Sequence, residues 1–326
     1  CVANAEGKWT FTVYDTRYFN PDTRNFYVNT ATRHNNTSEL SAPFVVGCKS
    51  CVCYVTNNYD HGKNSLRAEI DSAHSGACLN IEFQMSGSQT IQLLSELRPI
   101  EVPLSITGYF ENSLTAITLK GNSKFNGFNL VNGYSTIQNI NFKSFDTTFN
   151  VSSDFNNLKR NTIVQTLLPA KIFGNNNSLK KNCFNCDGRN MQDTSSVSDN
   201  AIEIYGDNNI IGVFENGNSF VNAIKSGDLV DSGVGNSLLY NAIYNTTQAI
   251  TLNNHGNNDY PPPTNIVSRK DGDIYYIQGR ANQGDRVQIF TTTYMRNDAN
   301  VFVVETIATD GTWQVVISSQ YILKDE

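Results

Sequence analysis

The chain has 326 residues, a formal net charge of −6, 39% hydrophobic residues and 17% charged residues. No Lys/Arg-rich stretch is present, which argues against a nucleic-acid partner, and no run of about 18 apolar residues is long enough to insert into a membrane. The 15 Tyr and 18 Phe residues are separated by many Asn, Ser, Thr and Gly residues, a composition typical of short strands joined by turns. We therefore predict an all-β protein of two or three domains.

The first element that we expect is a strand over residues 6–13, EGKWTFTV, in which Trp9, Phe11 and Val13 share one face. The same acidic-Gly-x-Trp step returns as DGTWQVVI, residues 310–317, with Trp313 in the equivalent place. The repetition indicates two copies of one module. We expect residues 1–47 to be the C-terminal part of one β-sandwich and residues 259–326 to be the N-terminal part of another. Each Trp would then lie in the core between two sheets.

The second copy resembles the small immunoglobulin-like modules of bacterial surface proteins. A glycine-rich pair of strands and a later D-G-x-W turn carry the resemblance, formed here by Gly279, Ala281, Gly284, Val287, Ile289, Phe290, Asp310, Gly311 and Trp313. The first copy is similar to the C-terminal part of such a module through the sequences TATR at residues 30–33 and NTSELS at residues 36–41. The resemblance implies a surface protein built from many modules, and we expect this sequence to be a segment of a longer extracellular polypeptide.

The seven cysteines allow two interpretations. Two C-x-x-C pairs, at residues 48/51 and 183/186, have a spacing found both in zinc sites and in local disulfides of exported proteins. The long stretch between the pairs disfavours a shared zinc ion, so disulfides are the preferred interpretation. The disulfide candidates are Cys48, Cys51, Cys53, Cys78, Cys183 and Cys186, which leaves Cys1 unpaired.

Residues 48–258 differ from both flanking modules. A short amphipathic helix is predicted over residues 65–73, with Ser65 as the N-cap and with Leu66 and Ile70 on its apolar face. Short strands follow, and apolar residues recur at steps of 21, 21, 31 and 28 residues. Such a period, with Asn-rich corners, predicts a right-handed parallel β-helix in which Asn residues adopt left-handed angles and stack in ladders. The predicted core positions are Ile137, Leu158, Leu179, Ile210 and Leu238.

The N-terminal part of this region resembles the start of secreted bacterial β-helix proteins, with a signature close to V-T-x-x-x-D-x-G-x-x-S-L-R-x-x-I. The matching residues are Val55, Thr56, Asp60, Gly62, Ser65, Leu66, Arg67 and Ile70. The resemblance implies that the short helix caps the open end of the β-helix. A cap is also needed on physical grounds, because the first coil would otherwise expose its core and its strand edges.

A polysaccharide lyase or hydrolase on this fold would need carboxylates that converge on one face. The candidates are Asp187, Glu203, Asp207, Asp228 and Asp231, with Arg189 and Lys225 as basic partners. The motifs of the polygalacturonase family are absent, and Asp207 and His255 fit a corner turn and a solvated linker better. We therefore predict no catalytic residues and keep the enzyme as the alternative.

Calcium is the one cofactor that the sequence leaves open, and Asp271, Asp273, Asp228 and Asp231 are the weak candidates for its ligands. Tyr134, Tyr275 and Tyr276 are candidates for stacking on sugars, although packing between strands explains them equally well.

Taken with the two resemblances, the sequence predicts a non-catalytic, adhesive spacer on the surface of a Gram-negative bacterium. Its expected partners are neighbouring modules, adjacent identical subunits and surface glycans.

Overall fold

A computed structural model describes residues 52–108, 116–185, 198–214, 217–221, 223–292 and 299–319, with only the backbone at residues 221 and 223–225. Nearer the N-terminus it describes the backbone of two antiparallel pairs: β1 (Asn25–Tyr27) with β4 (Phe44–Val46), and β2 (Thr32–Arg33) with β3 (Asn36–Thr37). Trp9 lies outside the described residues. The described structure is mostly β, and no helix in it is long and apolar enough to cross a membrane.

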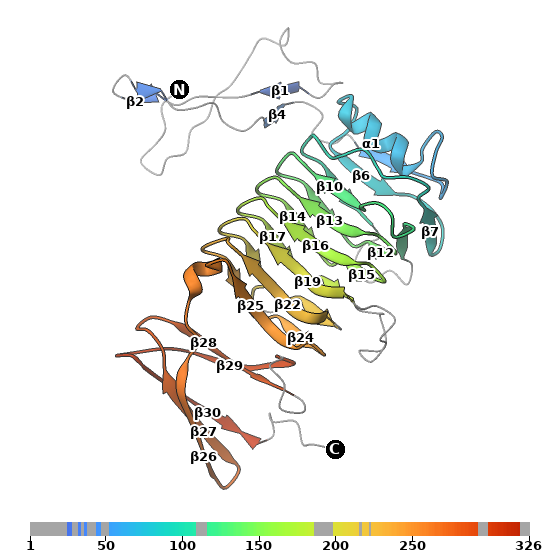
Figure 1. The fold of residues 1–326 in the computed structure, drawn as a ribbon. Helices are drawn as coiled ribbons and strands as arrows, with labels where there is room; N and C mark the ends of the chain where they lie inside the picture. The colour runs from blue at the N-terminus through green and yellow to red at the C-terminus, as the bar shows by residue number, and fades with distance from the viewer. Residues whose placement is uncertain are drawn as a thin grey trace.

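Three long parallel sheets occupy the chain from Val52 to Asn253 (Figure 1). From β8 onward, successive strands fall in the three sheets in a fixed rotation, and we call one such circuit a coil and the whole span the coiled region. The β5–β23 sheet contains, in spatial order, β5 (Val52–Val55), β6 (Asn80–Phe83), β8 (Ser105–Thr107), β11 (Thr136–Gln138), β14 (Asn157–Lys159), β17 (Ser178–Lys180), β20 (Ile210–Ile211) and β23 (Ser237–Leu238). The β7–β24 sheet contains β7 (Gln89–Gln92), β9 (Ile117–Lys120), β12 (Asn141–Lys143), β15 (Thr162–Val164), β18 (Cys183–Phe184), β21 (Ser219–Val221) and β24 (Ala242–Tyr244). The β10–β25 sheet contains β10 (Phe128–Leu130), β13 (Thr147–Val151), β16 (Leu168–Ile172), β19 (Ser198–Ile204), β22 (Ala223–Asp231) and β25 (Gln248–Asn253).

The core of the coiled region consists of apolar side chains stacked in register from one coil to the next. In the β7–β24 sheet, Phe142 pairs with Ile163, which pairs with Phe184, and all three are fully buried. In the β5–β23 sheet the corresponding column is Ile81, Ile106, Ile137, Leu158, Leu179, Ile211 and Leu238. Each coil therefore covers the core of the coil before it.

One predicted core position is wrong. Ile210 is 41% exposed, and its neighbour Ile211 is buried in register with Leu179. Adjacent residues of a strand point to opposite faces, so only one of the two isoleucines can face the core. Asn209 determines which isoleucine faces the core. It occupies the ladder position that Asn177 has in the preceding coil, and the core residue follows two positions later in both coils, as Leu179 and Ile211.

Buried asparagines hold two of the corners between the sheets. Asn182 shows the pattern: its Oδ1 accepts a hydrogen bond from the Asn161 backbone N–H at 3.0 Å, and its Nδ2 donates to the Leu158 carbonyl at 2.8 Å and to Asn218 Oδ1 at 3.1 Å. In both ladders the asparagine Oδ1 thus accepts a backbone N–H of the preceding coil, and most of these groups are buried. One ladder contains Asn161, Asn182, Asn218 and Asn241. The other contains Asn156, Asn177, Asn209, Asn236 and Asn257.

Left-handed backbone angles occur one residue before most of the ladder asparagines and at several other corners. Phe155 (φ 59°), Arg160 (φ 54°), Lys181 (φ 54°) and Tyr240 (φ 59°) occupy this position, as do some asparagines. The expectation that corner asparagines adopt left-handed angles holds for Asn176 and Asn208, and other residue types adopt the same conformation. A non-glycine residue in this region is uncommon, and the ladder hydrogen bonds on the next residue hold it in place.

We expect Asn182→Ala to lower the free energy of unfolding by more than about 2 kcal/mol, because at least two buried backbone groups lose their partners at about 1–3 kcal/mol each. Urea unfolding followed by circular dichroism measures the loss. Asn141→Ala is the control, since Asn141 is a partly exposed residue of β12 outside the ladders. Equal losses in the two variants would show that the ladder does not stabilise the coils.

A carboxyl group stands among the apolar columns of the β10–β25 sheet. Asp228 is in register between Ile202 and Ile250, and its side chain is wholly buried. Neither carboxyl oxygen has a hydrogen-bond partner among the described residues. Burial in these surroundings raises the pKa of Asp228 well above its ordinary value, since the charged form cannot be solvated.

Asp228→Asn should therefore stabilise the protein at neutral pH. The unfolded chain releases the Asp228 proton near pH 3.9, whereas the raised pKa keeps it bound in the folded chain to a higher pH. Wild-type stability thus falls by up to about 1.4 kcal/mol per pH unit between the two pKa values. The advantage of the variant in urea unfolding should be small near pH 4 and grow toward pH 7. Asp231→Asn, at a partly exposed carboxylate of the same strand, is the control; an advantage that does not change with pH would contradict the prediction.

The helix α1 (Leu66–His74) lies at the β5 end of the coiled region (Figure 1). The Ser65 Oγ caps it by accepting the Ala68 N–H at 3.3 Å, and Leu66, Ile70 and Ala73 are buried. These positions agree with the sequence pattern. The helix contacts β5 and β6, so it covers the first coil.

A disulfide closes the loop that carries α1. It joins Cys53 on β5 to Cys78, between α1 and β6, with the two Cα atoms 5.7 Å apart. Both cysteines are among the disulfide candidates predicted from the sequence, but the sequence did not indicate that they pair with each other. Cys183 is also disulfide-bonded, while Cys48, Cys51 and Cys186 lie outside the described residues.

A second β unit follows the short 3-10 helix η2 (Gly256–Asp259). It has one sheet in the order β26-β27-β30 and a second antiparallel pair, β28-β29. Trp313 is 3% exposed in the small core between them. A Cβ at Gly279 would lie 2.7 Å from the Trp313 ring, so glycine is required there. The strands are β26 (Thr264–Asp271), β27 (Ile274–Arg280), β28 (Arg286–Thr291), β29 (Val301–Ile307) and β30 (Thr312–Ser318).

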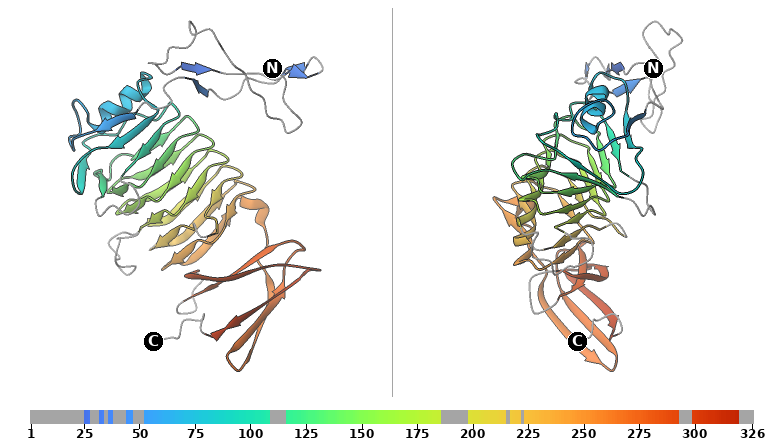
Figure 2. Two further views of the ribbon diagram at one scale, coloured as in Figure 1. Left: turned by 180° about the vertical axis from the view of Figure 1, so that it is seen from behind. Right: turned by 90° about the vertical axis from the view of Figure 1, so that its right-hand side faces the viewer.

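This unit contacts the last coil. Ile243 of β24 and Ala299 exchange backbone hydrogen bonds of 2.7 and 3.1 Å. The Tyr240 hydroxyl bonds to Glu305, which also contacts Arg286 at 3.4 Å. Both ends of the coiled region are therefore covered, by α1 at one end and by the β28-β29 pair at the other (Figure 2).

Candidate functional site

The corner between the β10–β25 and β5–β23 sheets is built to let backbones approach closely. A Cβ at Gly206 would lie 2.0 Å from the Gly174 carbonyl oxygen, and one at Gly174 would lie 1.9 Å from that of Ser153. Successive coils are thus in direct backbone contact here. Side chains on either side of the glycines must project outward, and they stack along the corner.

Two pairs of aromatic rings stack on the outside of this corner. Tyr134 and Phe155 are 51% and 48% exposed, with centroids 5.1 Å apart and planes 14° apart. Phe173, 47% exposed, and Tyr205 lie 4.8 Å apart at 20°. We call these four residues the aromatic corner. They come from four successive coils, because the corner repeats once per coil.

Charged and amide groups lie beside the second pair. Lys171 Nζ is 5.2 Å from the centroids of both Phe173 and Tyr205, and 3.7 Å from Glu203. Glu203 accepts hydrogen bonds of 3.0 Å from the Tyr205 hydroxyl and from Asn200 Nδ2. Burial, together with the hydrogen bond to Glu203, raises the pKa of Tyr205 to about 12, so its hydroxyl stays protonated near neutral pH.

The outward face of the β10–β25 sheet continues this polar surface. Asn129, Asn150, Lys171 and Glu203 stand in register on successive strands, and we call them the polar face. Asn150 donates to Asn129 at 3.0 Å, and Asn129 donates to Glu96 at 2.6 Å. Amide, carboxylate and ammonium groups therefore adjoin half-exposed rings, a surface suited to binding a molecule with both apolar faces and hydroxyl groups.

No family model matches the sequence, and no curated protein matches it.

The carboxylates expected in an enzyme do not converge on this surface. Glu203 is on the outward face of the β10–β25 sheet, whereas Asp228 is inside the core. Asp207 is a corner residue whose Oδ1 accepts the Val234 N–H at 2.8 Å, as expected. Asp231 accepts a hydrogen bond from Asn254 at 2.5 Å. Asp187, Arg189 and the Lys225 side chain lie outside the described residues.

The calcium candidates are also separated. Asp228 is enclosed in the core, away from the surface on which Asp231 contacts Asn254. Asp271 and Asp273 flank the β26–β27 turn, where Asp273 contacts Ser319 at 3.4 Å. Within the part of the chain that the structure describes, no three His, Cys, Asp or Glu side chains are grouped to hold a metal ion.

The remaining candidates lie away from the aromatic corner. Lys270 stands 5.2 Å from the Tyr275 ring and Arg269 4.8 Å from the Tyr276 ring, so both tyrosines pack against cations of β26. The His255 side chain is 89% exposed and contacts Asp259, in agreement with a solvated linker.

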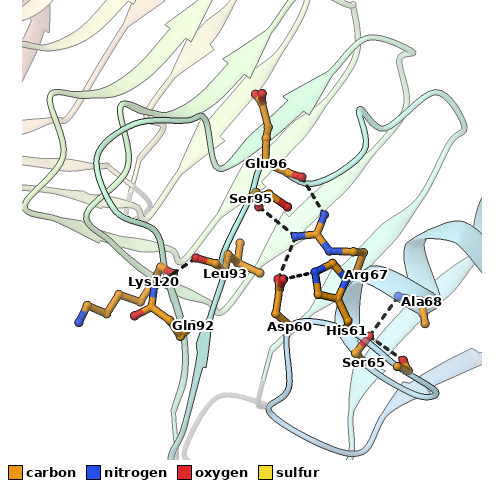
Figure 3. A network of polar contacts seen from close by, with 11 residues as sticks. Asp60, His61, Ser65, Arg67, Ala68, Gln92, Leu93, Ser95, Glu96 and Lys120 are labelled. Carbon is orange, nitrogen blue, oxygen red and sulfur yellow. Dashed lines mark hydrogen bonds and ion pairs between the residues drawn. The ribbon is translucent and has the colours of Figure 1, made fainter.

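A different polar cluster, formed by the sequence motif that precedes α1, has a structural role (Figure 3). Arg67 donates to Asp60 at 2.8 Å and to the carbonyls of Ser95 and Glu96 at 2.9 and 2.7 Å. The Asp60 side chain is 5% exposed and that of Arg67 16%. The guanidinium therefore ties α1 and the loop before it to the loop that follows β7.

Arg67→Met should cost about 3–5 kcal/mol in urea unfolding, since it removes the guanidinium from the buried Asp60 carboxylate and leaves it only the exposed His61 ring, 2.7 Å from its other oxygen. The Asp60→Asn/Arg67→Met pair should cost less than the sum of the two single changes, because the orphaned charge is gone. Arg98→Met is the matched control: Arg98 lies 2.8 Å from Glu101, but both side chains are about half exposed, so a loss below about 1 kcal/mol is expected. Additive losses at Asp60 and Arg67 would rule out the clamp.

The sequence contained a signal for the aromatic corner that went unused. Tyr134 and Phe155 are 21 residues apart, as are Ile137 and Leu158 in the core. Phe173 and Tyr205 are separated by one coil in the same way. Aromatic residues that repeat at the coil spacing outside the core pattern are candidates for a stacked exterior. Only Tyr134 was identified, without its partner.

Proposed function

We propose that the protein is a non-catalytic extracellular spacer that contacts neutral surface polysaccharides through the aromatic corner. The coiled region is a right-handed parallel β-helix, and the flanking units are immunoglobulin-like modules. The observation that carries the proposal is the continuous stacking of apolar columns in the coiled region. Such a core makes a stiff body whose sides present surface side chains at a constant spacing from one coil to the next.

Topology supports both fold assignments. A chain that passes through three parallel sheets in fixed rotation winds as a helix, and parallel crossovers are right-handed in nearly all proteins. In β26–β30, the first, second and fifth strands share one sheet and the third lies in the other. Immunoglobulin-like sandwiches place these four strands in the same way, although the fourth strand here, β29, pairs with β28, whereas it joins the sheet of the first, second and fifth strands in a constant-type domain.

Disulfides support an extracellular location. The Cys53–Cys78 bond and a bonded Cys183 fit an oxidising compartment better than the cytosol. The resemblances described above favour the surface of a Gram-negative bacterium.

The chemistry of the corner favours neutral polysaccharides as ligands. A sugar ring has an apolar face that packs on aromatic rings, and hydroxyls that bond to amides and carboxylates. Lys171 is paired with Glu203 and the chain carries a net charge of −6, so polyanions have no unpaired cation to bind on this cluster. The alternative, a polysaccharide-degrading enzyme, would have the carboxylate of Glu203, whose side chain is 18% exposed, and that of Glu96, which accepts a hydrogen bond from Asn129.

We expect the full chain to bind cellulose or β-1,3-glucan more tightly than alginate or pectate in pull-down and calorimetric titrations. Tyr134→Ala/Phe173→Ala should weaken this binding at least about tenfold, or about 1.4 kcal/mol, with little change in melting temperature because both rings are half exposed. Leu94→Ala/Leu167→Ala, at residues 69% and 60% exposed elsewhere, should leave binding unchanged.

Two results would overturn the proposal. The first is wild-type affinity in the Tyr134→Ala/Phe173→Ala variant, or no binding by the wild type. The second is the release of reducing ends or unsaturated products that Glu203→Gln abolishes, which would establish the enzyme instead.

A further inference from the structure

Two pairs of lysines stand in register on the outside of the coiled region. Lys120 of β9 is beside Lys143 of β12, and Lys159 of β14 is beside Lys180 of β17. In each strand the residue before the lysine is buried in the core, so the lysine side chain points outward. Neighbouring strands are about 4.8 Å apart, and each pair therefore places two ammonium groups side by side.

The corner where these two sheets meet carries further positive charge. Arg160 and Lys181 hold the same place in successive coils, one residue before the ladder residues Asn161 and Asn182. Lys181 is exposed. Five lysines from four successive coils thus lie on or beside this corner, and we call them the lysine patch: Lys120, Lys143, Lys159, Lys180 and Lys181.

The lysine patch has no acidic residues to balance it. Like charges on directly opposite residues of neighbouring strands lower stability, and the β10–β25 sheet avoids this by placing Glu203 in register with Lys171, 3.7 Å from its Nζ. The strands β9, β12, β14, β15 and β17 contain no Asp or Glu, although the chain has more acidic than basic residues. Within the described residues, no lysine of the patch forms an ion pair. An anion supplied by a ligand would therefore relieve a repulsion that the fold leaves in place.

A row of small polar side chains accompanies the lysines. Thr118, Asn141 and Thr162 stand in register on the outward face of β9, β12 and β15. Their hydroxyl and amide groups can form hydrogen bonds with sugar hydroxyls. The outward face of these three strands has no aromatic side chain on which a nucleic-acid base could stack. The combination of ammonium groups with hydroxyls and amides favours an anionic polysaccharide.

We propose that the lysine patch binds sulfated polysaccharides. Such a polymer can carry more than one charge per sugar, so it can meet both lysines of an in-register pair, which a polymer with one carboxylate per sugar does less densely. The patch is on a different corner of the coils from the aromatic corner, where Lys171 is already paired with Glu203. The inference therefore goes beyond the proposed function and does not depend on it.

The test is calorimetric titration of the full chain with dextran sulfate, with uncharged dextran as the matched ligand. Dextran sulfate should bind at low ionic strength and more weakly as salt is added, because binding releases counterions, and dextran should not bind. Lys120→Gln/Lys143→Gln and Lys159→Gln/Lys180→Gln should each weaken binding at least about fivefold, through the loss of two partly exposed ion pairs. Lys63→Gln/Lys270→Gln removes the same charge at exposed lysines elsewhere and should leave the affinity within about twofold of wild type.

The melting temperature of the two patch variants separates a ligand site from a structural role. Glutamine removes the repulsion between in-register lysines, so at low salt the melting temperature should stay unchanged or rise. Wild-type affinity in both patch variants would overturn the proposal. So would equal weakening by the control variant, or tighter binding of duplex DNA or phosphatidylglycerol vesicles than of dextran sulfate. Tyr134→Ala/Phe173→Ala should leave dextran sulfate binding unchanged, so this proposal and the proposed function can fail separately.

Discussion

The hydrogen bonds from each ladder asparagine to the coil before it are the constraint on which the rest of the structure depends. Such a side chain can pair the backbone N–H and the carbonyl of the preceding coil only if the two coils are in register. A slip of one residue would turn every inward side chain outward. The choice of Ile211 over Ile210 shows this directly, since Asn209 places the core residue two positions later. The apolar columns therefore follow from the corners as much as from hydrophobicity.

The same constraint organises the exterior. The residue before a ladder asparagine is in the left-handed region in most coils, whatever its type, as Phe155 and Arg160 show, and Tyr134, which precedes Ser135 at the corresponding corner, has the same conformation. Its side chain leaves the corner at the same place in every coil, one strand spacing of about 4.8 Å from the next. Rings at this position must stack, and Tyr134 and Phe155 do so at 5.1 Å. The Tyr134–Phe155 pair is thus a consequence of this corner conformation, whereas Phe173 and Tyr205 stack at the residues before Gly174 and Gly206. A ligand along the aromatic corner would meet each pair of rings at about the coil spacing.

The features that recur in every coil could be predicted from the sequence. The features that occur once, such as the disulfide and the buried carboxyl group, could not. Leu158, Leu179 and the helix at Ser65 belong to patterns that recur or follow local rules. The Cys53–Cys78 bond depends on the pairing of β5 with β6 across the intervening helix, and C-x-x-C spacing carries no trace of it. Asp228 is a charged residue at a position where the pattern has apolar residues. Only its register with Ile202 shows that its side chain lies in the core. The sandwich around Trp313 could be anticipated through a resemblance, whereas the exposure of β26 required coordinates.

Stacked coils have two kinds of surface, the sides and the ends. The sides repeat, so a ligand that is itself a repeating polymer can contact several coils at once and gain affinity without any single strong contact. The ends do not repeat: each would leave unpaired strand edges, which Arg67, α1 and the disulfide cover at one end and the β28-β29 pair covers at the other. Covering the second end moves the exposed edge outward from the coils to β26 and β28.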